Sequence, residues 1–321
     1  MRIKPIIIVA GEPNSIFSEI FLKSINSKKF KRPLILICSL KLFKMQMRRL
    51  KFKNNINIIN YNDLKKIKLT NKSINLIDIK FNQKTAFEKI SQKSKNYIHQ
   101  SFQIAFKIIK SGITDKLING PISKKKFLNN RFLGITEFIS DSFSIKRNAM
   151  LIFNQELSVC PITTHLPIKL VSKSISKNLI FEKVNLVNNF YKTYLGYTPK
   201  IAFTGLNPHC ETSFGINEDK SIIEPSLKYL KKKGFKVFGP YSADTIFLKN
   251  NRKNYNVIMG MYHDQVLGPL KTLYEYDAIN ITLGLPFVRI SPDHGPNETM
   301  TGKNLSNPLS LIKAISFLDK N

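Results

Sequence analysis

The chain has 321 residues, of which 42% are hydrophobic and 22% are charged, a composition that suits one large or two modest globular domains with a buried core. Its formal net charge of +30 would attract anionic ligands of any kind, but lysine is abundant along the whole sequence. The sequence contains no RNA-recognition signature, zinc finger or helix-turn-helix. Charge alone therefore assigns no function, and nucleic-acid binding is the less favoured hypothesis.

Two features of the sequence bear on its compartment. No apolar run approaches the roughly 18 residues of a membrane span, and the opening stretch MRIKPIIIVAGEPN lacks a small-residue cleavage site. The cysteines Cys38, Cys160 and Cys210 form no CxxC pair. We therefore expect a cytoplasmic protein with reduced thiols and no membrane partner.

Short β-branched runs alternate with longer amphipathic segments along the chain. Buried strands are expected at residues 4–10, 32–39, 116–122, 148–154, 200–207, 256–263 and 278–285. Helices are expected at residues 18–27, 100–112, 178–196 and 225–234. Continuous apolar strands that alternate with helices indicate an α/β fold with a largely parallel sheet.

Several of the expected strands end in polar, turn-forming residues. These ends lie at 10–14, 119–124, 163–167, 205–209, 239–245 and 262–265. In open α/β sheets ligands bind at the carboxyl ends of strands. A single end of this kind is usually only a polar loop, but their number predicts one shared site.

Three of the five histidines, His165, His209 and His263, each follow an expected strand and stand close to a turn-forming proline or an aspartate. A lone histidine is more often a hydrogen-bonded structural residue than a ligand, and the long spacings match no local metal motif. Three imidazoles with an open position are nevertheless a familiar way to hold Zn²⁺ or a similar ion. Both interpretations stay open. If the histidines hold a metal ion, Asp244 and Asp264 are natural acceptors that fix an imidazole tautomer.

A cationic group follows the third histidine, at Lys271, Asn280 and Arg289. Arginine and lysine with an amide donor make a clamp for phosphate or carboxylate, because charge-assisted hydrogen bonds are the strong ones. The stretch YHDQVLGPLK (262–271) is therefore interpreted as a site at a strand end rather than as a simple Gly-Pro turn.

The sequence resembles the 4-hydroxythreonine-4-phosphate dehydrogenase (PdxA) family of pyridoxal 5'-phosphate biosynthesis. The most specific segments are TTHLP (163–167), GLNPH (205–209), SADT (242–245), YHDQ (262–265) and TLGLPFVRISPDHG (282–295). They occur in the family's order, and the resemblance runs essentially from end to end.

The resemblance implies a two-domain α/β/α sandwich of the isocitrate/isopropylmalate dehydrogenase-like type, with mostly parallel sheets and a central cleft. Residues 1–135 and 300–321 would form the first domain. Residues 136–299 would form the second and carry most metal and substrate residues. The resemblance also implies a homodimer with its active site at the subunit interface, and NAD binding without a GxGxxG loop.

Site residues carry over from the family one by one. The resemblance assigns a divalent metal ion (Zn, Mg or Co) to His165, His209 and His263. It assigns substrate binding to Thr136, Lys271, Asn280 and Arg289. It assigns catalytic roles to Asp244, Asp264 and Lys271.

The implied reaction is the oxidation of 4-phosphooxy-L-threonine by NAD⁺, followed by decarboxylation to 3-amino-1-hydroxyacetone 1-phosphate. A divalent ion on the substrate's amino and hydroxyl groups would lower the hydroxyl pKa and ease hydride loss. Binding of the remote phosphate would supply energy for positioning.

The sequence also departs from the family pattern. Ile135 stands where the family has a substrate-contacting histidine, and a lost charge-assisted bond can cost about 1.5–3 kcal/mol. Ser15 and Phe17 replace usual glycines, and the segments 209–215 and 296–304 differ as well. The alternative is therefore a related dehydrogenase for threonate or erythronate 4-phosphate. A basic nucleic-acid-binding protein on the same scaffold is a more distant one.

Overall fold

The computed structural model describes residues 3–128, 132, 134–213, 215 and 217–320. The chain forms two compact units, unit 1 (Met1–Ile139 and Pro286–Asn321) and unit 2 (Ser140–Leu285). These boundaries differ from the expected ones, so Thr136 and Arg289 belong to unit 1 rather than to the second domain. Arg289 belongs to unit 1 because its strand, Val288–Pro292, pairs with Lys116–Asn119 in the unit 1 sheet.

Unit 1 is built on an all-parallel sheet with the strand order β3-β4-β2-β1-β5-β12. Its strands are β1 (Ile6–Val9), β2 (Leu34–Cys38), β3 (Ile56–Ile58), β4 (Ile74–Asp78), β5 (Lys116–Asn119) and β12 (Val288–Pro292). Its helices are α1 (Phe17–Ser27), α2 (Leu40–Arg49), η1 (Tyr61–Asp63), α3 (Ser94–Lys110), α4 (Lys124–Phe127) and α12 (Leu309–Lys320). Helix α5 (Ile135–Ser142) begins in unit 1 and ends in unit 2.

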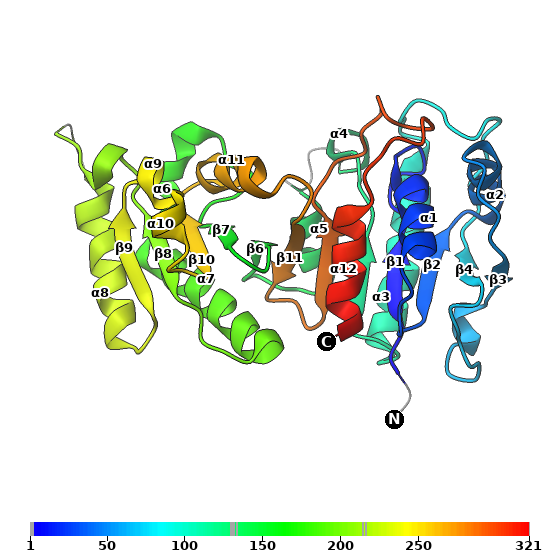
Figure 1. Cartoon of the computed structure of the whole chain (residues 1–321), viewed down its shortest axis with the longest axis horizontal. Helices are drawn as coiled ribbons and strands as arrows, with labels where there is room; N and C mark the ends of the chain where they lie inside the picture. The colour runs from blue at the N-terminus through cyan, green and yellow to red at the C-terminus, as the bar shows by residue number, and fades with distance from the viewer. Residues whose placement is uncertain (1–2, 129–131, 133, 214, 216, 321) are drawn as a thin grey trace. The chain divides into compact units, whose positions relative to one another are not determined.

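The unit 1 sheet is covered by helices on both faces (Figure 1). Strands β1 (IIIV) and β2 (LILIC) are buried along their whole length, as continuous apolar strands are in a parallel sheet. The connection from β1 to β2 moves the chain toward one edge of the sheet, and the connection from β4 to β5 moves it toward the other edge. Right-handed crossovers therefore place α1 and α3 on opposite faces, and α12 packs beside α1.

Unit 2 contains a mixed sheet with the strand order β11-β6-β7-β10-β8-β9, in which only β6 is antiparallel to its neighbours. Its strands are β6 (Ala149–Phe153), β7 (Ser158–Pro161), β8 (Ile201–Thr204), β9 (Val237–Tyr241), β10 (Val257–Gly260) and β11 (Ile279–Leu283). Its helices are α6 (Val171–Ser174), α7 (Lys177–Phe190), α8 (Glu224–Lys232), α9 (Ala243–Ile246), α10 (Lys249–Arg252) and α11 (His263–Tyr274). Shorter helical turns are η2 (Ile168–Leu170), η3 (Tyr191–Leu195), η4 (Pro208–Cys210) and η5 (Asp219–Ile223).

Helix α11 corrects one sequence-based prediction. The stretch 262–271 was expected to be a strand end, but strand β10 stops at Gly260 and a helix begins at His263. This helix continues through Pro269. Val266, Leu267 and Leu270 have the spacing of one helical face and are buried in the unit 2 core, so their burial outweighs the break that Gly-Pro usually signals.

The predicted fold class is confirmed, because each unit combines helices with a mostly parallel sheet. None of the helices in the described part of the chain has the length and apolar character needed to span a membrane.

Candidate active site and metal centre

Three histidines lie just beyond the carboxyl ends of three neighbouring strands in unit 2. His165 follows β7, His263 follows β10 and His209 follows β8, and β10 runs parallel between the other two strands. The carboxyl ends of parallel strands meet at one edge of a sheet, which is the edge where open α/β sheets bind ligands. The topology therefore brings residues that are far apart in sequence to one edge.

His165 and His263 form the closest part of this group. Their ring centroids are 6.0 Å apart and their planes are inclined by 38°, and both residues are half-buried. Nδ1 of His263 lies 2.6 Å from Oδ1 of Asp264. When Nδ1 carries the proton, the Nε2 lone pair of His263 is available to a metal ion; the role of Asp264 in fixing this tautomer stays a prediction.

His209 sits on a strained turn after β8. Its backbone is left-handed, with φ 55° and ψ 20° in η4, a conformation that costs a non-glycine residue about 1–3 kcal/mol and is concentrated at functional sites. Nδ1 of His209 lies 3.2 Å from Oγ of Ser242, just after β9. The hydrogen bond from Ser242, with a smaller contribution from His209, holds the pKa of the exposed Asp244 carboxyl below its usual value.

Asp219 holds the turn that carries His209, and the sequence analysis missed it. Its carboxylate is fully buried and accepts hydrogen bonds from the backbone N–H groups of Leu206 (2.8 Å) and Asn207 (3.0 Å). It also accepts one from the Asn207 side chain at 2.9 Å. No motif marks Asp219, because its partners lie in a different loop. Phe214, in the segment that departs from the family pattern, lies outside the described residues.

The donor types at this edge suit a divalent metal ion. Imidazole nitrogen is a preferred ligand of Zn²⁺ and Co²⁺, and a carboxylate beside it fixes the tautomer. Within the described residues, however, no three histidine, cysteine, aspartate or glutamate side chains are grouped closely enough to hold one ion. The structure brings the rings of two of the histidines to 6.0 Å, in a tilted arrangement, and sets the third on the neighbouring strand end, so the three-histidine site stays a prediction.

Lys271 and Asn280 are not part of the histidine group in unit 2. Lys271 is eight residues along α11 from His263, about 12 Å at the helical rise of 1.5 Å per residue. Asn280 lies within β11 and pairs with Ile152 of β6, which separates it from β7. Both side chains are half-buried.

In unit 1, Arg289 and Thr136 are close together. The Arg289 guanidinium is fully buried in β12 and donates from Nε to Oδ1 of Asn119 at 2.7 Å. It also donates from Nη1 to the Thr136 hydroxyl at 3.4 Å. Burial lowers the pKa of Arg289 to about 10, while the negative charge of Glu137 opposes the lowering. The two acceptors, Asn119 and Thr136, are neutral groups, and a buried arginine that keeps its charge is a candidate to bind an anionic group.

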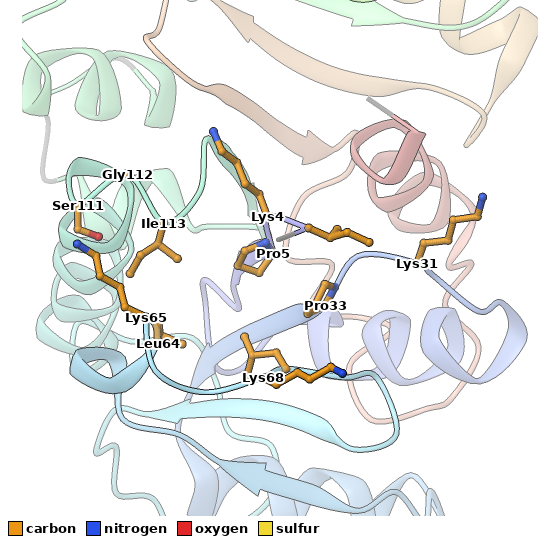
Figure 2. Close-up of a pocket in the computed structure, with 12 residues that line it drawn as sticks. Lys4, Pro5, Lys31, Pro33, Leu64, Lys65, Lys68, Ser111, Gly112 and Ile113 are labelled. Atoms are coloured by element: carbon orange, nitrogen blue, oxygen red, sulfur yellow. The ribbon is translucent and has the colours of Figure 1, made fainter. Parts of the chain in front are cut away.

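A cavity of about 630 Å³ in unit 1 lies at the opposite edge from such sites. Lys4 and Lys31 precede β1 and β2, and Lys65 and Lys68 follow η1 around its rim (Figure 2). The cavity adjoins the amino ends of the parallel strands, whereas open α/β sheets bind ligands at the carboxyl ends. It is therefore not assigned to the candidate site.

Glu12, at the carboxyl end of β1, is a buried acid that the sequence analysis missed. Its Oε2 accepts a hydrogen bond from the Ser94 hydroxyl at 2.9 Å, and its Oε1 accepts one from the Asn14 N–H at 3.4 Å. Burial raises the pKa of Glu12 to about 7, and the nearby charge of Glu298 acts in the same direction. Glu12 therefore titrates near neutral pH.

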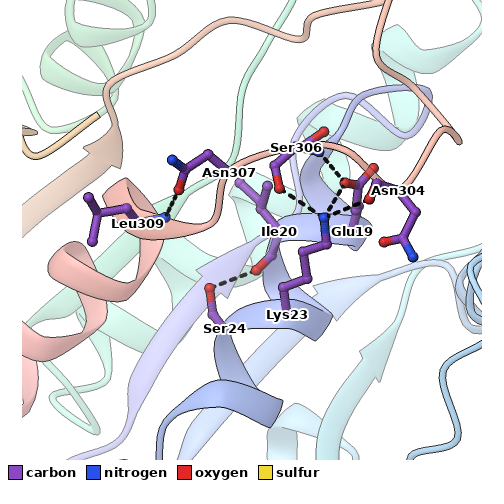
Figure 3. Close-up of polar contacts among 8 residues, drawn as sticks. All are labelled: Glu19, Ile20, Lys23, Ser24, Asn304, Ser306, Asn307 and Leu309. Atoms are coloured by element: carbon purple, nitrogen blue, oxygen red, sulfur yellow. Dashed lines mark hydrogen bonds and ion pairs between the residues drawn. The ribbon is translucent and has the colours of Figure 1, made fainter. Parts of the chain in front are cut away.

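Glu19, a second buried acid of unit 1, has structural partners (Figure 3). It accepts hydrogen bonds from Lys23 Nζ at 2.8 Å and from the Ser306 N–H at 2.5 Å. Lys23 also donates to the carbonyl groups of Asn304 and Ser306, both at 3.0 Å. This pair fastens α1 to the segment that leads into α12.

The fold and the histidine edge define an α/β protein whose candidate site lies at the carboxyl ends of parallel strands. A solved β-decarboxylating dehydrogenase from Thermococcus kodakarensis shares the fold, with a TM-score of 0.51 and 12% identity over 98% of this chain and 82% of its own. A solved putative 4-hydroxythreonine-4-phosphate dehydrogenase from Salmonella typhimurium is more similar, with a TM-score of 0.83 and 26% identity over 99% of both chains.

Sequence comparisons give the family. The family model described as "Pyridoxal phosphate biosynthetic protein PdxA" matches residues 29–318. A relative from Sulfurihydrogenibium sp. (strain YO3AOP1), named 4-hydroxythreonine-4-phosphate dehydrogenase, is 36% identical over 97% of this chain and 96% of its own length. The chain belongs to the PdxA family.

Proposed function

We propose that this chain oxidises 4-phosphooxy-L-threonine with NAD⁺ and releases CO₂, giving 3-amino-1-hydroxyacetone 1-phosphate for pyridoxal 5'-phosphate biosynthesis. Family membership supports the substrate class and the dehydrogenase reaction. The observation that carries the proposal is the arrangement of His165, His263 and His209 at three adjacent carboxyl ends of the unit 2 sheet.

The metal ligands in this proposal are His165, His209 and His263. A divalent ion held there supplies a Lewis acid that lowers the pKa of the substrate hydroxyl and accepts the charge that develops during the reaction. Asp264, whose Oδ1 lies 2.6 Å from Nδ1 of His263, would keep the proton on Nδ1 and leave Nε2 available as a metal ligand. Three imidazoles favour Zn²⁺ or Co²⁺ over Mg²⁺, which prefers oxygen ligands.

Anionic groups of the substrate are bound by cations of the chain. In unit 1 the buried Arg289 guanidinium and the Thr136 hydroxyl bind one such group, and in unit 2 Lys271 and Asn280 contribute charge and an amide. Burial makes the Arg289 contact strong, because little water competes for its donors.

NAD⁺ is the hydride acceptor. The working form is a homodimer with its site at the subunit interface, as the family resemblance implies. The protein acts in the cytoplasm, which the free cysteines support.

A second substrate is favoured by one residue. Ile135, at the first position of α5, offers no hydrogen bond where the resemblance implies a substrate-contacting histidine, so the second candidate is threonate 4-phosphate, which carries a hydroxyl in place of the amino group. Parallel assays of NADH formation with 4-phosphooxy-L-threonine and with threonate 4-phosphate decide between the two. A higher kcat/KM for threonate 4-phosphate would overturn the substrate assignment while leaving the reaction type intact.

The reaction type is tested by His209→Ala, with His99→Ala as the matched control. His99 is exposed on α3, and its ring centroid lies 6.4 Å from that of Phe138. We expect His209→Ala to abolish metal-dependent NADH formation with little loss of stability, and His99→Ala to keep wild-type turnover. Wild-type turnover by His209→Ala with metal present would show that the ligand assignment is wrong.

A further inference from the structure

One side chain of unit 2 joins the turns that carry two of the histidines. Gln265 lies in the first turn of α11, two residues after His263. Its Oε1 accepts hydrogen bonds from the Met261 N–H at 2.7 Å and from the Thr204 hydroxyl at 2.8 Å. Its Nε2 donates to the Gly205 carbonyl at 2.8 Å. Thr204 ends β8, so a single amide links the turn after β8 to the turn after β10.

Met261 extends the link to the third histidine. Its carbonyl accepts hydrogen bonds from the Thr163 hydroxyl at 2.7 Å and from the Thr163 N–H at 3.2 Å. Thr163 stands two residues before His165, in the turn after β7. A continuous hydrogen-bonded chain therefore runs from Thr163 through Met261 and Gln265 to Thr204 and Gly205, across all three histidine-bearing turns.

The backbone is shaped to admit this contact. A Cβ atom added at Gly260 would lie 2.4 Å from a methyl carbon of Val266 and 3.0 Å from Oε1 of Gln265. One added at Gly205 would lie 2.7 Å from Oδ1 of Asp219. Both strand ends therefore need glycine so that α11 and the Asp219 carboxylate can approach closely.

We propose that Gln265 is a positioning residue for the metal site, because its amide sets the register of the His209 and His263 turns. The inference rests on the proposed function, since it concerns the same histidines. Only an amide satisfies the geometry, because one oxygen must accept two hydrogen bonds and one nitrogen must donate a third. A partner that orients metal ligands in this way is worth about 10–100-fold in metal affinity.

The unit 1 residue Gln46 provides a matched control. It is buried, whereas Gln265 is half-buried, and like Gln265 it makes three side-chain hydrogen bonds, donating to the Pro13 and Ala86 carbonyl groups and accepting from the Ser18 hydroxyl. It touches none of the histidine-bearing turns. Gln46→Met and Gln265→Met therefore remove the same number of hydrogen bonds, and only the second removes them from the candidate site.

The experiment is a Co²⁺ titration of the metal-stripped full-length protein, followed by visible absorption, with urea unfolding in parallel. We expect Gln265→Met to weaken Co²⁺ binding about 10–100-fold and Gln46→Met to leave it unchanged, at comparable losses of stability. Thr204→Val removes one of the three hydrogen bonds and should fall between wild type and Gln265→Met. Gln265→Glu should not restore affinity, because its carboxylate would face the Gly205 carbonyl.

The outcomes separate the inference from the function on which it rests. If wild-type protein binds Co²⁺ and Gln265→Met binds it equally well, Gln265 has no positioning role, while the metal site stands. Equal weakening by Gln46→Met would also overturn the inference, since the effect would then follow stability alone. If the wild-type protein itself shows no Co²⁺ binding, the proposed metal site fails and the role of Gln265 fails with it.

Discussion

Replacing Arg289 by methionine should separate substrate binding from stability. The guanidinium is fully buried, and burial lowers its pKa from 12.5 to about 10. At about 1.4 kcal/mol for each pKa unit, this lowering corresponds to about 3 kcal/mol that disfavours the charged side chain in the folded state. The folded pKa of a base is depressed here, so the penalty is fully present at pH 7 and is relieved only as the pH rises above about 10.

The substitution removes this penalty but loses a hydrogen bond. Asn119 Oδ1, which accepts from Arg289 Nε at 2.7 Å, would become a buried acceptor without that donor, at a cost of about 1–3 kcal/mol. The two effects nearly cancel. The free energy of unfolding of Arg289→Met should therefore lie between the wild-type value and about 2 kcal/mol above it.

Substrate binding should respond very differently. A charge-assisted hydrogen bond to a phosphate or carboxylate contributes about 1.5–3 kcal/mol, which corresponds to a rise in KM of about tenfold to more than a hundredfold. Urea unfolding and steady-state NADH formation measure the two quantities. Arg147→Met is the control, because Arg147 is 74% exposed in its ion pair with Glu182 and should change neither. A loss of more than about 3 kcal/mol in stability with an unchanged KM would refute the reasoning and make Arg289 purely structural.

Four further substitutions test the described contacts. Glu12 has its pKa raised from 4.5 to about 7, so its contribution to stability is full below pH 4.5 and is lost as the pH rises through 7. Glu12→Gln should therefore flatten stability between pH 5 and 8 and add about 1–3 kcal/mol at pH 8 by urea unfolding; an unchanged slope would contradict the raised pKa. Glu19→Ala should cost about 2–4 kcal/mol, because Lys23 loses its carboxylate partner and the buried Ser306 N–H loses its acceptor. Lys4→Ala, in an exposed pair with Asp115, should cost at most about 1 kcal/mol. Asp219→Asn should weaken Co²⁺ binding about tenfold by loosening the His209 turn, and wild-type affinity would argue against that role.

Local patterns predicted the fold class but not the boundaries between units. Strands β1, β2 and β10 are buried along their whole length, and their continuous apolar runs can be recognised in the local sequence. Strand β12 was not recognised, because its sequence VRISP has a charged residue at the second of only five positions. Its membership in unit 1 depends on pairing with β5, far away in the chain, and a non-local pairing leaves no periodicity to detect.

The histidines were recognisable as a group, whereas the side chains that hold their turns were not. Each histidine follows an apolar run, which is a local signal, and the family motifs add the expected roles. Asp219 and Gln265 act through hydrogen bonds to residues in other loops, such as Leu206 and Thr204. Helix α11 was missed because the local Gly268-Pro269 sequence predicts a turn. The segment is helical because one face of the helix is buried in the unit 2 core.

The most direct test of the account is X-ray absorption spectroscopy of the purified, Zn²⁺-loaded protein, which counts the imidazole ligands of the ion. The account predicts three imidazole nitrogens at about 2.0–2.1 Å, falling to two in His165→Ala, His209→Ala and His263→Ala alike. Coordination by oxygen atoms without imidazole scattering, or a spectrum that none of the three substitutions alters, would contradict it.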